Sequence, residues 1–122
     1  NSFVQLAGVA ALKQCAPHVA AMRTEYDRRR RHLIPHLEAL GLKVHARPSG
    51  AFYVLADARH ISMDSLGLAK EILEETGVAL TPGIDFGPGA EGFLRFSYAN
   101  SLENLDQAVD RIKRYFQGRG WL

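Results

Sequence analysis

Arg95 is the residue whose type and setting best suit binding chemistry. It follows a glycine-rich stretch, Gly83–Gly92, and lies in an alternating apolar segment, Phe93–Tyr98, that predicts a strand. On such a strand Arg95 shares a face with Phe93 and Ser97. A guanidinium held there offers a planar fork to a carboxylate, with two charge-assisted hydrogen bonds. From the spacing alone, an ordinary ion pair with an Asp or Glu of the same chain is the commoner arrangement, and both interpretations stay open.

Two histidines, His32 and His36, stand four residues apart, which is the spacing of zinc ligands on one helix face. No third ligand is evident in the sequence, and no Glu follows His32. Pro35 lies between the two histidines and disturbs the helical geometry there. We therefore interpret both residues as surface histidines and predict no metal site.

Four consecutive arginines, Arg28–Arg31, form a basic patch in a chain whose formal net charge is only +2. Such a patch can contact phosphates. However, consecutive residues spread around a helix, and Glu25 and Asp27 precede Arg29 and Arg31 by four residues, the spacing of helical ion pairs. We therefore predict a solvated, internally paired helix face and no nucleic-acid partner.

The glycines from Gly83 to Gly92 could let backbone N–H groups approach a phosphate closely. Phosphate loops of the common kinds lead from a strand into a helix, whereas this stretch leads into the strand predicted over 93–98 and contains no Lys. We therefore expect a loop of defined shape that positions Arg95. The sequence has no Gly-x-Ser-x-Gly elbow and no cysteine with an adjacent base signature, so nucleophilic hydrolysis has no support.

The elements that must position these residues are visible in the hydrophobic periodicity. Repeats of three and four predict helices and alternation predicts strands. The order is α, α, β, β, α, β, β, α, which favours an α/β domain of the α+β kind: a small mixed or antiparallel sheet of three or four strands covered by helices, with a long N-terminal linking helix. The helices are predicted over 3–15, 17–41, 65–77 and 101–118, and the strands over 42–46, 52–56, 78–81 and 93–98.

Length and composition narrow the class of protein. A chain of 122 residues with 47% hydrophobic and 23% charged residues fits one globular domain, neither disordered nor fibrous. The single cysteine, Cys15, excludes an internal disulfide, so a reducing compartment is the default. No apolar run approaches the roughly 18 residues of a membrane span, and we expect a cytoplasmic location without a membrane partner. Because the first residue is Asn and an apolar pattern is already under way, we expect a fragment.

Two blocks of sequence resemble the class I and II aminotransferases, pyridoxal-phosphate enzymes of the aspartate-aminotransferase fold. The first block is Pro48–Tyr53; the second is Thr81–Ala99, which contains an Arg-x-Ser-x-Ala motif beginning at Arg95. The long helix and the closing helix extend the resemblance over nearly the whole chain. It implies that residues 1–41 link a large domain to a small one and that residues 42–122 are the C-terminal small domain.

The resemblance also implies an activity for the longer parent protein. In the family, the arginine matched by Arg95 binds the α-carboxylate of the substrate, and an amino group passes between an amino acid and a 2-oxo acid. Pyridoxal 5'-phosphate is held by the large domain, so we expect no catalytic and no cofactor-binding residue here and an inactive fragment. The parent is expected to be a homodimer active in amino acid metabolism. The lysines of this chain match no cofactor-binding position of the family: Lys13, Lys43, Lys70 and Lys113.

Other functions remain open at this point. Carbon–sulfur lyases and aminotransferase-like transcription regulators share this domain and differ from transaminases in sequence upstream of it. A further alternative, from a different functional class, is a non-catalytic interaction domain in which Arg28–Arg31 binds an acidic partner.

Overall fold

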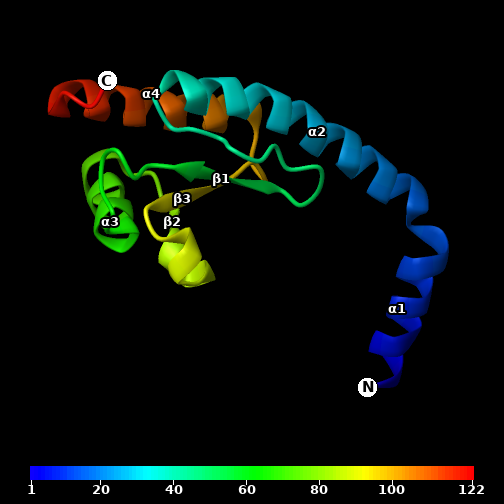
Figure 1. The fold of residues 1–122 in the computed structure, drawn as a ribbon. Helices are drawn as coiled ribbons and strands as arrows, with labels where there is room; N and C mark the ends of the chain where they lie inside the picture. The colour runs from blue at the N-terminus through cyan, green and yellow to red at the C-terminus, as the bar shows by residue number, and fades with distance from the viewer.

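Four helices and a three-stranded sheet make up the computed structural model, which describes all residues from Asn1 to Leu122 (Figure 1). The α/β small-domain fold predicted from the sequence is confirmed, and the four predicted helices agree with those observed to within about two residues at each end. The elements are α1 Ser2–Gln14, α2 Ala16–Ala39, β1 Tyr53–Asp57, α3 Ser65–Thr76, β2 Thr81–Pro82, β3 Phe93–Ser97 and α4 Leu102–Arg119, with 3₁₀ turns at Gly83–Phe86 and Pro88–Ala90.

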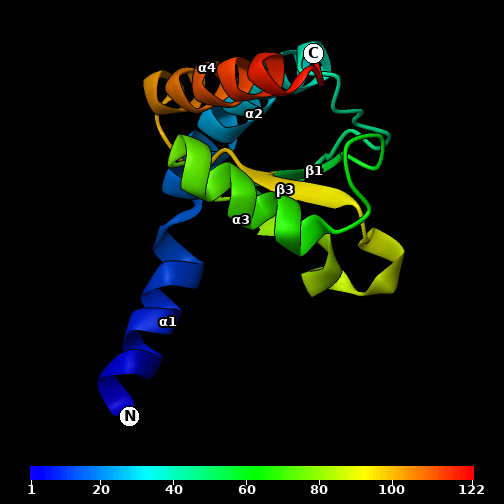
Figure 2. The same cartoon turned by 90° about the vertical axis from the view of Figure 1, so that its left-hand side faces the viewer.

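The sheet is antiparallel throughout, and its strand order is β1-β3-β2, so β3 lies in the middle. Arg95 is opposite Leu55 of β1 and Thr81 of β2. Helices α2 and α4 run side by side over one face of the sheet, while α3 contacts α4 and the β2 edge (Figures 1 and 2). The core lies between these layers, and it contains Leu94 and Phe96 of β3.

Two of the predicted strands are wrong: one does not form, and the other is shorter than predicted. Residues 42–46 form no strand; only Lys43 makes an isolated bridge, to Asp57 at the end of β1. The chain then turns away towards Pro48, which has no N–H to donate to a ladder. The strand predicted over 78–81 is reduced to β2, Thr81–Pro82, because Val78 to Leu80 find no pairing strand within the chain.

The end of α2 is fixed by a Schellman motif. Gly41 adopts a left-handed φ of +79°, and its N–H donates to the carbonyl of Glu38 at 3.0 Å. The N–H of Leu42 donates to the carbonyl of Leu37 at 3.1 Å, and both leucine side chains are fully buried. This pattern satisfies the last helical carbonyls and brings an apolar pair together, so it anchors the long helix to the core.

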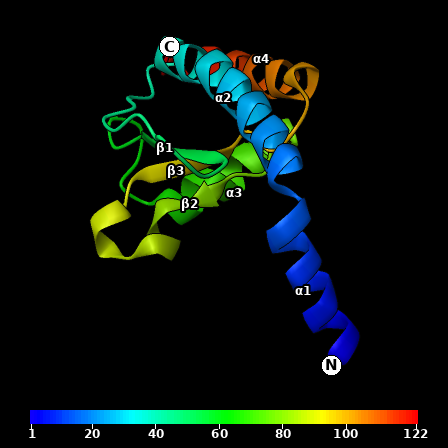
Figure 3. The same cartoon turned by 90° about the vertical axis from the view of Figure 1, so that its right-hand side faces the viewer.

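Helix α1 stands away from the rest of the molecule (Figure 3). None of its residues is buried, and Phe3 and Leu12 are 68% and 89% exposed. The core of 18 buried residues draws instead on α2, the sheet, α3 and α4. The apolar side chains of α1 are therefore left uncovered by this chain. No helix of the structure is both long and apolar enough to cross a membrane.

The glycine-rich loop before β3 is as tight as its composition predicts. Gly83 is buried, and a Cβ at this position would overlap the carbonyl oxygen of Ala90 and lie 2.7 Å from that of Phe93. The obstacles are backbone atoms, which cannot move aside without reshaping the loop. Gly89, six residues later in the same loop, has no atom within 4 Å of where its Cβ would stand.

We predict that Gly83→Ala destabilises the chain by about 2 to 3 kcal/mol, because the added methyl overpacks a backbone contact. Urea unfolding followed by circular dichroism measures the loss. Gly89→Ala is the matched control and should change stability by no more than about 0.5 kcal/mol. Equal unfolding midpoints for the two variants would contradict this description of the loop.

Candidate carboxylate-binding site

Arg95 extends from the face of β3 opposite the core, as the alternation predicts. Its neighbours Leu94 and Phe96 are buried on the other face. The guanidinium carbon lies 5.1 Å from the centre of the Tyr53 ring and 5.3 Å from that of Phe86. Tyr53 is placed diagonally across the β1–β3 ladder and Phe86 by the loop, so two separate segments hold the guanidinium between aromatic faces.

The guanidinium of Arg95 has no partner within the chain. Its Nε is buried without a hydrogen-bond acceptor, and no carboxylate lies within ion-pairing distance. The intramolecular ion pair that spacing alone favours is therefore not formed. A buried N–H without an acceptor costs about 1 to 3 kcal/mol. A carboxylate offers the two oxygens that a guanidinium fork accommodates best, so the arrangement suits a carboxylate ligand.

Aromatic contacts continue from Tyr53 to the long helix. The Phe52 ring packs edge-on against Tyr53 at 5.6 Å and lies 6.4 Å from Tyr26 of α2. Tyr26 also contacts Tyr98, the buried residue just after β3. Burial raises the pKa of Tyr98 above its usual range, so this phenol stays neutral. The Tyr53 ring beside Arg95 is thus connected to α2 by aromatic contacts through Phe52 and Tyr26.

The loop that carries Phe86 is fastened to the start of α3. The Glu91 carboxylate accepts hydrogen bonds from the N–H of Ser65 at 2.7 Å and of Gly92 at 3.1 Å. The Ser65 hydroxyl accepts from the N–H of Ile84 at 3.1 Å. The hydroxyl and N–H of Ser65 hold the pKa of Glu91 below its usual range, and the helix N-terminus favours the same charge. The sequence offered no signal for this contact between residues 26 positions apart.

A second carboxylate, Asp57, secures the end of β1 where β3 begins. It accepts from Nε of Arg59 at 2.9 Å and lies 2.7 Å from Nε2 of His45. Arg59 in turn lies over the Phe93 ring at 5.0 Å and against Gly92. The Arg59 side chain, with further help from its N–H and from His45, holds the pKa of Asp57 well below its usual value of 3.8.

We predict that Asp57→Asn loses about 2 kcal/mol of stability at pH 7, the value of a hydrogen bond to a charged group. Because the folded-state pKa of Asp57 is depressed, its contribution is full above the unfolded value near 3.8 and disappears as the pH falls through the folded value. Urea unfolding of both proteins at pH 7, 5, 3 and 2 should show the wild-type advantage shrinking below pH 4. A difference that is constant with pH would contradict the assignment.

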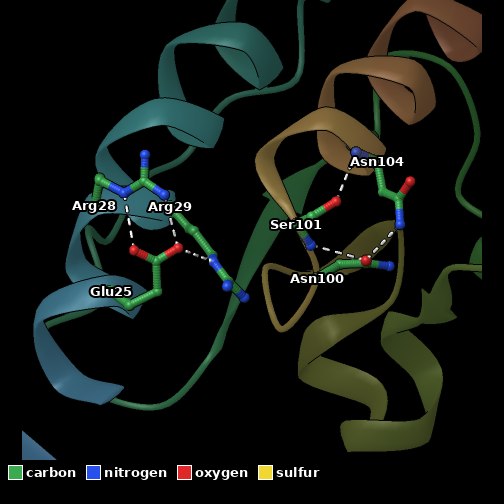
Figure 4. Close-up of polar contacts among 6 residues, drawn as sticks. All are labelled: Glu25, Arg28, Arg29, Asn100, Ser101 and Asn104. Carbon is green, nitrogen blue, oxygen red and sulfur yellow. Dashed lines mark hydrogen bonds and ion pairs between the residues drawn. The ribbon is translucent and has the colours of Figure 1, made fainter. Parts of the chain in front are cut away.

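The four consecutive arginines of α2, Arg28–Arg31, are paired within the helix, as predicted. Glu25 accepts from Arg28 at 2.9 Å and from Arg29 at 2.7 Å, and Figure 4 shows these contacts as dashed lines. Asp27 pairs in the same way with Arg30 and Arg31. The hydrogen bonds from Arg28 and then Arg29 lower the pKa of Glu25 to about 2. Each acid pairs with the arginine four residues later, as the sequence predicted. Each also pairs with the arginine three residues later, which the sequence analysis did not include.

Helix α4 begins directly after the Arg-x-Ser-x-Ala segment, and its start is capped by side chains. The Ser101 hydroxyl accepts from the N–H of Asn104 at 3.2 Å (Figure 4). The amide oxygen of Asn100 accepts from the N–H of Ser101 at 2.9 Å and from the side chain of Asn104 at 2.8 Å. This double cap fixes where the chain turns from β3 into α4.

The two histidines singled out from the sequence are joined by a residue that the sequence did not indicate. Nε2 of His32 lies 2.5 Å from a carboxylate oxygen of Asp106 on α4, and His36 lies beside His32. A third candidate ligand is therefore present, contrary to the expectation from the sequence. The group lies on the α2–α4 layer and takes no part in the surroundings of Arg95.

The residues of this chain do not form a pyridoxal-phosphate site. Such a site needs a lysine amine in a protected position and donors around a phosphate. All four lysines are exposed: Lys13, Lys43, Lys70 and Lys113. None of them lies in the arrangement around Arg95. The arginine site fits a carboxylate, and the cofactor would have to be held by residues outside this chain.

The fold is that of the small α/β domain found in aminotransferases, and comparisons with known proteins agree. The family model for aminotransferase class I and II matches residues 1–112. The chain belongs to the class I and II aminotransferase family, which confirms the resemblance seen in the sequence.

Particular relatives cover most of this chain but only part of their own length. A putative aminotransferase, YugH, from Bacillus subtilis is 39% identical over 93% of this chain and 29% of its own length. The aspartate/prephenate aminotransferase of Thermus thermophilus is 50% identical over 79% of this chain and 24% of its own length. The chain thus spans less than a third of the curated relatives it matches.

Solved structures show the same relation. A Pyrococcus protein, described as protein-A1, superposes with a TM-score of 0.91 at 38% identity, over 98% of this chain and 31% of that chain. A double mutant of Thermus thermophilus aspartate aminotransferase gives a TM-score of 0.83 at 44% identity, over 93% of this chain and 30% of that chain. The domain seen here is one part of a larger architecture in those proteins.

Proposed function

We propose that this chain is the C-terminal part of a pyridoxal-phosphate-dependent aminotransferase and that Arg95 binds the α-carboxylate of its substrates. The longer protein transfers an amino group between an amino acid and a 2-oxo acid. The observation that carries the proposal is the buried Nε of Arg95, which lacks an acceptor although its guanidinium is already held between Tyr53 and Phe86. Both substrates carry the carboxylate that would complete this arrangement.

The role of Arg95 is orientation. A bidentate grip fixes the carboxylate in the plane of the guanidinium, and this restricts rotation of the substrate about its Cα. The cofactor supplies the electron sink of the reaction when it is bound. The protein contributes by holding the carboxylate away from the bond to be broken, so that proton removal from Cα competes successfully with loss of the carboxylate.

The division of the chain supports a place within a longer protein. We assign residues 1–41 to the connection with a large domain and residues 42–122 to the small domain. The exposed apolar side chains of α1 need a covering surface, and the relatives contain more than twice as many further residues as this chain supplies. That large domain would hold pyridoxal 5'-phosphate, and the parent protein would be a cytoplasmic homodimer.

We predict that the 122-residue chain alone neither binds the cofactor covalently at one specific lysine nor transaminates, because its lysines are all exposed and none has a site built around it. Incubation with pyridoxal 5'-phosphate, reduction with borohydride and mass spectrometry test this. The expected result is no more labelling than in a chemically unfolded sample. Stoichiometric labelling of one lysine in the folded chain alone would contradict the proposal.

We predict that Arg95→Lys in the full-length protein lowers kcat/KM by roughly 30- to 150-fold, equivalent to about 2 to 3 kcal/mol for the lost charge-assisted fork. Spectra of the cofactor-loaded protein, mixed with a panel of amino acids in a single turnover, give the rate of conversion to the amino form. Arg114→Lys, on the exposed face of α4, is the control and should retain the wild-type rate.

The outcomes separate the substrate role from the family assignment. An unchanged rate in Arg95→Lys would contradict the proposed role of Arg95 but not the proposed transaminase activity of the longer protein. A protein that binds the cofactor but converts no amino acid would indicate a carbon–sulfur lyase or a transcription regulator. A protein that does not bind the cofactor at all would overturn the proposed activity.

A further inference from the structure

We infer that His32, His36 and Asp106 form a binding site for one divalent transition-metal ion, of which Zn²⁺ is the representative, on the face of the domain away from Arg95. A ring nitrogen of each histidine and a carboxylate oxygen of Asp106 all lie within 4.8 Å of one another. Two imidazoles and a carboxylate are a ligand set that zinc accepts, with a fourth position left for water. Nothing in the aminotransferase proposal uses these residues.

The two histidines are already arranged on one side of α2. Nδ1 of His36 lies 2.7 Å from the backbone carbonyl of His32. Because a carbonyl oxygen only accepts, this nitrogen carries the proton, and Nε2 is left with the lone pair that a metal needs. Many histidine ligands to metals are oriented by such a hydrogen bond from their other ring nitrogen.

Asp106 supplies the third ligand from a different helix. Its Oδ1 lies 2.5 Å from Nε2 of His32, although the two residues are 74 positions apart in sequence. The packing of α2 along α4 brings them together (Figure 2). The side chains of His32 and Asp106 are 31% and 49% exposed, so an ion can reach them from solvent.

The adjustment needed for metal binding is small. In a tetrahedral zinc site the ligand atoms stand roughly 3.4 Å apart, given bond lengths near 2.1 Å. The 2.5 Å contact must therefore open by about 1 Å, and no separation, being at most 4.8 Å, has to close by more than about 1.4 Å. Rotation of partly exposed side chains accomplishes this without movement of either helix.

The chemistry selects the class of ion. Imidazole nitrogens favour Zn²⁺, Ni²⁺, Co²⁺ and Cu²⁺, whereas Mg²⁺ and Ca²⁺ prefer sites made of oxygen ligands. A bound ion would bridge α2 and α4, in place of the single His32–Asp106 contact seen now. Because it binds the folded arrangement, it would also raise the unfolding temperature, by an amount that grows with the logarithm of the free-ion concentration above Kd.

The test is isothermal titration of Zn²⁺ into the 122-residue chain, prepared without a polyhistidine tag and in a buffer that does not chelate metal. The wild type should bind one equivalent, and His36→Gln and Asp106→Asn should each lower the affinity at least about tenfold. His36 is exposed, so its replacement leaves the fold intact, and circular dichroism checks this. His18→Gln, an exposed histidine on the same helix, is the matched control and should bind as the wild type does.

Two further readouts accompany the titration. Zn²⁺ should raise the unfolding midpoint of the wild type and of His18→Gln, but not that of the His36→Gln/Asp106→Asn double variant. A large excess of Mg²⁺ should not displace the bound zinc. The inference is overturned if the wild type shows no saturable binding, if the double variant binds equally well, or if Mg²⁺ displaces the ion. None of these results depends on whether the parent is a transaminase.

Discussion

The central position of β3 is the constraint on which the rest of the structure depends. It is the one strand paired along both edges, and its two faces meet opposite environments. The side chains of Leu94 and Phe96 are buried in the apolar core, while Arg95 between them contacts the Tyr53 and Phe86 rings on the other face. A slip of one residue against β1 or β2 would place a guanidinium in the core, so the hydrophobic face of the strand also fixes the register of the arginine.

The elements around β3 hold it from several directions. Asp57 and Arg59 secure its first residue, Glu91 and Ser65 secure the preceding loop, and the cap at Ser101 secures the turn that follows. This support explains how an arginine without a hydrogen-bond partner is tolerated: the cost of its buried Nε, about 1 to 3 kcal/mol, is offset by the stability of the elements packed around β3. Rigid surroundings of this kind are also what a precise binding site requires.

The sequence was sufficient to predict the helices and the face of β3 on which Arg95 lies, because both follow from the periodicity of neighbouring residues. It failed over 42–46 and 78–80, where a strand pattern exists but no neighbouring strand is available to pair with it. It also favoured an ion pair for Arg95 and saw no partner for His32. Those outcomes depend on contacts between residues far apart in sequence, such as Tyr53 with Arg95 and His32 with Asp106, which spacing within one element cannot reveal.

The uncovered face of α1 has a consequence for the lifetime of this chain. A helix with no buried residue opens at little free-energy cost, whereas the core opens only in global unfolding. Its bare side chains, Phe3 and Leu12 among them, are of the kind that chaperones bind, and its backbone is within reach of proteases. Produced alone, the chain would therefore be lost at a rate set by α1, whatever the stability of the domain behind it.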